Sequence, residues 1–175
     1  MAIVEDRPFD SESLTPLPVC RPARRVGKWV SFAEARQRLR ALDAVVIDAE
    51  VETAGRIFVS MGQAGANVRL ARGLVTGCKL IDEVQPHIVL LATRLPDGDA
   101  YELALRLKAA NGKVPMVVAI GTLDGRGDRK RFLDIGCDAF LRKPIDVHLF
   151  ALELARQLPP GPMIAAVPAT PPYGR

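Results

Sequence analysis

Five short apolar runs, each followed by a longer amphipathic segment, constrain the fold of this chain more than any other feature. Each run has the length of a buried strand, and each following segment repeats its apolar residues at helical spacing. The predicted strands cover residues 45–47, 68–71, 88–91, 116–120 and 139–141, and the predicted helices cover 52–64, 76–84, 99–110, 126–135 and 146–157. Strands that alternate with helices indicate a parallel sheet with helices on both faces.

Right-handed crossovers between parallel strands leave few topologies for such a chain. We expect an α/β fold, a flavodoxin-like doubly wound five-stranded parallel sheet of strand order 2-1-3-4-5 with an N-terminal extension. In sheets of this kind the working crevice lies beyond the carboxyl ends of the strands, where the strand order reverses. Functional side chains are therefore expected directly after Ile47, Leu91, Ile120 and Leu141.

Composition divides the chain into four regions: an extended, proline-containing arm over 1–30, a short basic helix packed on the domain over 31–43, the α/β domain over 44–158, and a proline-rich tail over 159–175. The short helix is predicted over 32–41 because Ser31 and Glu34 have the spacing of a capping box. Its apolar residues follow at helical spacing and should pack as one stripe on the domain; they are Phe32, Ala35, Leu39 and Leu42.

The net charge of +4 is unevenly distributed along the 175 residues. Residues 1–20 hold four acids and one base, a net −3, and residues 21–40 hold seven bases and one acid, a net +6, which leaves +1 for residues 41–175. The basic character is therefore an N-terminal feature. A local basic segment can attract an anionic partner, and it can equally be a solvated helix face.

Other sequence features point to a cytoplasmic protein. No apolar run approaches the roughly 18 residues of a membrane span, and the acidic N-terminus does not resemble a secretory signal. The three cysteines are Cys20, Cys78 and Cys137, whose number and wide spacing favour reduced thiols over a disulfide framework or a zinc site.

Three segments at the predicted carboxyl ends carry a recognisable pattern: VVIDAE over 45–50, IVLLATRLPDGDA over 88–100, and GCDAFLRKP over 136–144. Together they resemble the receiver domain of two-component response regulators, over about residues 44–157. The Lys-Pro pair that closes a fivefold strand–helix repeat is the most specific part. The resemblance implies a signalling role in a phosphorelay-type pathway.

The resemblance also implies a set of site residues. Receivers use an Asp after strand three as the nucleophile, two acids after strand one that help to hold Mg²⁺, a hydroxyl after strand four, and a Lys before a Pro. Here the corresponding positions are Asp48 and Ala49 for the acids, Ala92 for the nucleophile, Ile120 for the hydroxyl, and Lys143 with Pro144. A methyl group cannot attack phosphorus. We therefore predict a degenerate pseudo-receiver with no metal and no cofactor, leaving open Asp48 as a different acceptor.

Neighbouring polar residues do not restore this site. Thr93 is one residue beyond Ala92 and should face the other side of the sheet, and Glu50 lies beyond the metal-binding place. Lys143, without its usual acids, should form an ion pair with Asp48. Arg94 could cover the crevice and face Asp48 or Glu50, or it could point into water.

The main functional hypothesis is a stand-alone interaction module that acts without phosphorylation and is not an enzyme. Receivers transmit their state through the face made by the fourth helix, fifth strand and fifth helix of the domain. Here that face would carry Arg126, Arg129, Lys130, Arg131, Phe140 and His148. The partner would be a kinase, a phosphotransfer protein or another adaptor, and a homodimer is a further option.

Three alternatives stay open at this point. Arg21, Arg24 and Arg25, with the basic segment over 126–131, could bind an anionic ligand such as a cyclic dinucleotide, since arginine forks suit phosphates. Nucleic-acid binding by residues 21–40 ranks lower because the main domain is nearly neutral. An enzyme on this fold ranks lowest, because the sequence has no Gly-rich phosphate loop and His87 and His148 lack ligand spacing.

Overall fold

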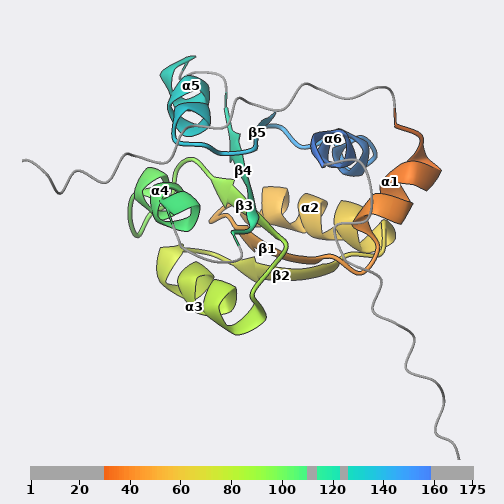
Figure 1. Ribbon diagram of the computed structural model, residues 1–175, viewed down its shortest axis with the longest axis horizontal. Coiled ribbons are helices and arrows are strands. Elements are labelled where there is room, and N and C mark those ends of the chain that lie inside the picture. Colours follow the sequence, from red (N-terminus) through yellow and green to blue (C-terminus); the bar gives the residue numbers. More distant parts are fainter. Residues whose placement is uncertain (1–29, 110–113, 123–125, 159–175) are drawn as a thin grey trace, which may run out of the picture.

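The structure, a computed structural model, describes residues 30–109, 114–122 and 126–158. Five parallel strands form one sheet: β1 (Asp43–Ile47), β2 (Asn67–Ala71), β3 (Ile88–Ala92), β4 (Met116–Gly121) and β5 (Ala139–Arg142). Their order is β2-β1-β3-β4-β5, so the predicted flavodoxin-like topology is confirmed (Figure 1). The arm and tail expected at the two ends of the chain fall outside the described residues, apart from Val30.

Helices cover both faces of the sheet (Figure 1). They are α1 (Phe32–Leu39), α2 (Val51–Gln63), α3 (Leu74–Val84), α4 (Ala100–Ala109), α5 (Arg126–Asp134) and α6 (Phe150–Gln157). One core lies beneath α1, α2 and α6, and the other lies beneath α3, α4 and α5. Side chains alternate along the central strand β3, so that Leu90 enters the first core and Leu91 the second.

Helix α1 begins with the predicted capping box. Ser31 Oγ accepts a hydrogen bond from the backbone N–H of Glu34 at 3.2 Å, and the Glu34 carboxylate accepts from the Ser31 N–H at 3.0 Å. Ala35 and Leu39 are buried, and Arg38 Nη1 donates to the carbonyl of Ala155 near the end of α6 at 3.2 Å. Helix α1 therefore packs beside α6 on the first core.

Phe32 was expected to pack on the domain with Ala35 and Leu39, but it is 49% exposed, so that expectation is wrong. Ala35 and Leu39 are the buried residues of α1. On α2, Phe58 is likewise 47% exposed, whereas Ile57 and Met61 are fully buried. Helix α2 therefore turns Phe58 away from the side that packs on the sheet.

The last helix starts four residues later than predicted. The side chain of Asp146 accepts hydrogen bonds from the N–H groups of His148 at 2.8 Å and Leu149 at 3.3 Å, which holds residues 146–149 in a turn before α6 begins at Phe150. This is the usual competition of a short acidic side chain with helical backbone bonding. The prediction that His148 lies on the helix is therefore wrong.

Helix α3 receives its N-terminal cap from a distant loop. Its N-cap residue, Gly73, has no side chain, and the carboxylate of Asp97 accepts hydrogen bonds from Leu74 N–H at 3.0 Å and Val75 N–H at 3.4 Å. The bond from Leu74 contributes most to lowering the pKa of Asp97. A Cβ on Gly73 would lie 2.3 Å from Asp97 Oδ2, so glycine is needed here for space.

We predict that Asp97→Ala lowers the thermal midpoint by about 3 °C, the order of shift expected when a chain of this size loses one helix cap. Gly73→Asn alone should also destabilise the fold, because its side chain would meet the Asp97 carboxylate. The combined exchange Gly73→Asn with Asp97→Gly should recover most of the loss, since the cap is then local. Thermal unfolding followed by circular dichroism measures all three variants. If the double variant loses as much stability as the two single variants together, the side chains at positions 73 and 97 do not compete for the same space.

Candidate functional site

The carboxyl ends of β1 and β5 bring together one basic and one acidic side chain. Asp48 follows β1, Lys143 follows β5, and Lys143 Nζ lies 2.7 Å from Asp48 Oδ2. The Asp48 side chain is 3% exposed and that of Lys143 is 15% exposed. The ion pair expected from the sequence is therefore present, and it is shielded from water.

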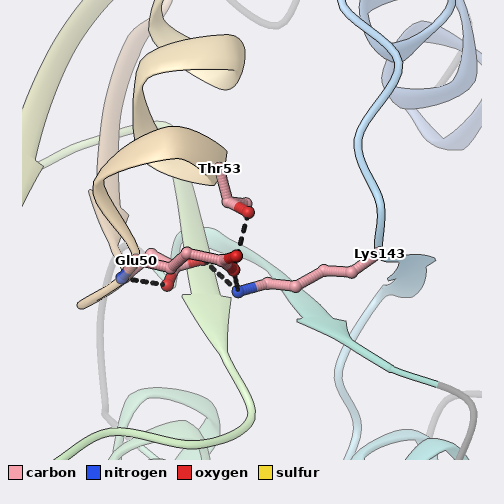
Figure 2. A network of polar contacts seen from close by, with 4 residues as sticks. Glu50, Thr53 and Lys143 are labelled. Atoms are coloured by element: carbon pink, nitrogen blue, oxygen red, sulfur yellow. Dashed lines mark hydrogen bonds and ion pairs between the residues drawn. The ribbon is translucent and has the colours of Figure 1, made fainter.

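A second carboxylate, that of Glu50, completes this cluster (Figure 2). Lys143 Nζ donates to Glu50 Oε2 at 2.8 Å, and Thr53 Oγ1 donates to the same oxygen at 2.8 Å. The backbone N–H of Glu50 donates to Asp48 Oδ1 at 2.9 Å. Glu50 immediately precedes α2, and the spacing of Glu50 and Thr53 at a helix start was the signal in the sequence that these side chains meet.

The two carboxylates keep Lys143 charged. Burial alone would lower the pKa of Lys143, but the hydrogen bonds and charges of Asp48 and Glu50 outweigh it, and the pKa is raised. The pKa of Glu50 is lowered, mainly by the hydrogen bond from Lys143 and then by that from Thr53. Asp48 Oδ2 has no well-directed hydrogen bond among the described residues, so its close contact with Nζ is chiefly ionic.

Ala92 lies at the carboxyl end of β3, between the β1 and β4 ends of the crevice, and is buried. Ala49 is exposed beside Asp48. Ile120, at the position where receivers carry a hydroxyl group, is the register partner of Ala92 and is buried in the core beneath α1, α2 and α6. Gly121, the last residue of β4, faces the opposite side of the sheet, towards Thr93 and Phe140.

Gly121 leaves room that two other side chains fill. A Cβ at this position would lie 2.6 Å from Thr93 Oγ1, 2.9 Å from Thr93 Cγ2 and 3.1 Å from Phe140 Cζ. The Thr93 side chain and the edge of the Phe140 ring thus occupy the space of a side chain at position 121. The contact of Thr93 with the space beside Gly121 agrees with the expectation that Thr93 faces the other side of the sheet from Ala92. Sequence reasoning missed Gly121, since close packing between strands leaves no periodic signal.

Arg94 does not enter the crevice. Its side chain is exposed, and no ion pair among the described residues joins it to Asp48 or Glu50. Of the two alternatives, the structure favours the one in which Arg94 points into water. Pro144, joined to Lys143 by a cis peptide bond, lies in the loop that carries the lysine.

The expected partner face is partly committed to internal contacts. Lys130 pairs with Asp134 at 2.6 Å, and the Arg131 guanidinium lies 4.0 Å from the ring centroid of Tyr101. Arg129 is exposed, His148 is exposed in the turn before α6, and Phe140 is half-buried. The side chain of Arg126 and the whole of Arg21, Arg24 and Arg25 lie outside the described part of the chain.

The arrangement limits the chemistry of the crevice. Asp48, Glu50 and Lys143 together carry a net charge of −1 when ionised, so the cluster should repel an added anion. Within the described ranges, no group of three or more His, Cys, Asp and Glu side chains is placed to hold a metal ion.

Over the same ranges, no helix has the length and apolar character of a membrane span.

Several known regulatory proteins are similar to parts of this chain. Over 69 residues the chain is 45% identical to the response regulator PleD of Caulobacter vibrioides, a match that covers 38% of this chain and 15% of PleD. Over 108 residues it is 28% identical to the DNA-binding dual master transcriptional regulator RpaA of Synechocystis, covering 59% of this chain and 44% of RpaA. The chain thus spans less than half of either relative, and no protein-family model matches it.

Solved structures agree with the fold. The BeF₃-activated receiver domain of DrrB, a response regulator of Thermotoga maritima, has a TM-score of 0.57 at 20% identity, covering 67% of this chain and 97% of the domain. The five-stranded parallel sheet therefore has the fold of a receiver domain. The sequence similarity to response regulators extends over only part of the chain.

We predict that Lys143→Met lowers the free energy of unfolding by about 3 kcal/mol, because it leaves the buried Asp48 carboxylate without a counter-charge. Glu50→Gln should cost no more than about 1 kcal/mol, since Glu50 is exposed and solvent screens its charge. Urea unfolding at pH 7 measures both. Equal losses for the two variants would contradict the unequal burial of the two carboxylates.

The same cluster predicts a pH dependence. The folded pKa of Glu50 lies below its unfolded value of about 4.3, so its stabilisation is full above that pH and is lost as the pH falls through the folded pKa. The folded pKa of Lys143 lies above its unfolded value of about 10.4, so its stabilisation is lost as the pH rises through the folded pKa. As the pH falls from 5 to 3, the thermal midpoint should therefore decrease less steeply in Glu50→Gln than in the parent chain. An equal decrease in both proteins would contradict this.

Proposed function

We propose that this chain is a receiver-like signalling module that works without aspartyl phosphorylation, through protein–protein contacts in a two-component or phosphorelay-type pathway. The observation that supports it best is Ala92 at the carboxyl end of β3, where receivers are expected to hold their nucleophilic Asp. A carbon side chain offers no lone pair to phosphorus, so the relay reaction has no acceptor there.

The charge cluster supports the same proposal. Lys143, which the receiver resemblance assigns to the phosphoryl group, already has two carboxylate partners at 2.7 and 2.8 Å. An incoming phosphoryl group would have to displace them and would meet a net negative site. The second acidic place, Ala49, supplies no oxygen for Mg²⁺, which prefers carboxylate and phosphate ligands.

The proposed partner surface is the solvent side of α5, β5 and α6. Arg129 and Arg142 are exposed there, and neither has an acidic partner among the described residues. Leu149, 49% exposed, adds an apolar contact. Such a surface favours a partner with an acidic rim, since charge complementarity raises the association rate and the specificity of binding.

Incubation with acetyl phosphate and Mg²⁺, followed by intact mass measurement, tests the missing reaction. We expect no phosphate on the parent chain. Ala92→Asp alone should also stay unmodified, because Ala49 still leaves the metal place incomplete, whereas Ala49→Asp with Ala92→Asp should accept one phosphate. A hydroxylamine-sensitive phosphate on the parent chain would contradict the proposal, and the double variant shows that the assay can detect the reaction.

Charge reversal tests the partner surface. We expect Arg129→Glu to weaken binding of the signalling partner by about tenfold, the equivalent of roughly 1.4 kcal/mol, as measured by surface plasmon resonance with a partner recovered by affinity capture. Lys79→Glu makes the same charge change at an exposed position of α3 and serves as the control. Equal effects of the two substitutions would place the partner elsewhere.

A further inference from the structure

The outer side of β2 has no pairing partner in the described part of the chain. β2 is an edge strand, bonded only to β1. Asn67 N–H donates to the carbonyl of Leu42, and the carbonyl of Ala71 accepts from Asp48 N–H, so the odd-numbered residues of β2 bond towards β1. By alternation, the backbone groups of Val68 and Leu70 point outwards, and such a row is a template for another strand.

A groove of about 490 Å³ lies beside this edge and has two different walls. Phe58 and Val68 line it on the side of α2, and Arg69 and Val84 line it on the side of α3. Asp43 also lines the groove, and its carboxylate accepts a hydrogen bond from Asn67 Nδ2 at 3.0 Å. Phe58 and Leu70 remain 47% and 42% exposed. An edge strand with exposed apolar neighbours is an aggregation hazard unless something covers it.

The same edge carries two unneutralised cations. The side chains of Arg69 and Arg72 are exposed, and neither has an acidic partner among the described residues. If two copies of the chain paired through their β2 strands, centred on the middle residue, Arg69 of one copy would lie opposite Arg69 of the other. Like charges directly opposite each other are destabilising. The edge therefore favours an acidic strand over a second copy of itself.

The first residues of the chain have the complementary pattern. Ile3 and Val4 are β-branched and favour strands. Glu5 and Asp6 follow them, within a 20-residue segment of net charge −3. Pro8 has no N–H and would end a ladder just beyond these acids.

We propose that residues 2–6 dock in cis on the outer edge of β2 as a sixth strand. Alternation would then place Val4 on the apolar wall with Phe58, and Glu5 on the other wall with Arg69. Residues 6 and 30 are separated by a chain that can span roughly 80 Å when extended, so reach does not limit the contact. This docking is independent of the proposed signalling function, since it concerns the opposite edge of the sheet from β5.

Amide hydrogen exchange by NMR on the full chain tests the docking. We expect the outward amides of Val68 and Leu70 to exchange at least about tenfold more slowly than in the variant Val4→Pro, which removes a ladder N–H from the proposed strand. Thr15→Pro makes the same type of change outside residues 2–6 and is the matched control. The amides of β3 report on global folding in every variant.

A charge exchange adds an independent readout. Glu5→Arg should reduce the protection of Val68 and Leu70, and Glu5→Arg combined with Arg69→Glu should restore it. Exchange at these two amides that is equally fast in the parent chain and in Val4→Pro would overturn the proposal. Protection that increases with protein concentration would also overturn it, because the strand would then come from another copy.

Discussion

The ion pair between Asp48 and Lys143 is the interaction on which the crevice depends. A carboxylate that is 3% exposed is tolerated in a folded protein only when a counter-charge and hydrogen bonds replace its water. Lys143 Nζ supplies the charge and the Glu50 N–H supplies a hydrogen bond. The pair ties the end of β1 to the loop after β5, across the whole width of β3 and β4. Through Glu50 it also fixes the start of α2.

This constraint connects the fold to the proposed function. A lysine that is held by two carboxylates is not free to meet an incoming anion, and the neighbouring strand ends offer only carbon side chains at Ala92 and Ile120. The space beside Gly121 is taken by Thr93 and by the ring of Phe140. The edge of the sheet is therefore packed, and two carboxylates compensate the charge of its lysine. A signal from such a domain would depend on which protein it meets, not on the modification of an aspartate.

Much of this could be predicted from the sequence, for identifiable reasons. The β–α alternation fixes a parallel sheet, and the short apolar runs located all five strands. The pairing of Asp48 with Lys143 followed because two strand ends at the same edge must bring a lone acid and a lone base together.

The errors arose where a neighbouring contact decides a side chain's direction. Glu50 was set aside, although the helix that begins after it turns its carboxylate towards Lys143. The start of α6 was misplaced because the side chain of Asp146 bonds the backbone that would have been its first turn.

The most direct test of the central claim is a titration of the ¹⁵N-labelled chain with beryllofluoride and Mg²⁺, followed by NMR. Beryllofluoride forms its phosphoryl-like adduct on a carboxylate, and the amides of Thr93, Gly121 and Lys143 surround the place where it would form. With Lys143 held by Asp48 and Glu50 and with no carboxylate at position 92, these amide signals should not move. A saturable shift of all three at equimolar protein would show that the crevice still accepts a phosphoryl mimic, and would contradict the claim that it is closed to this chemistry.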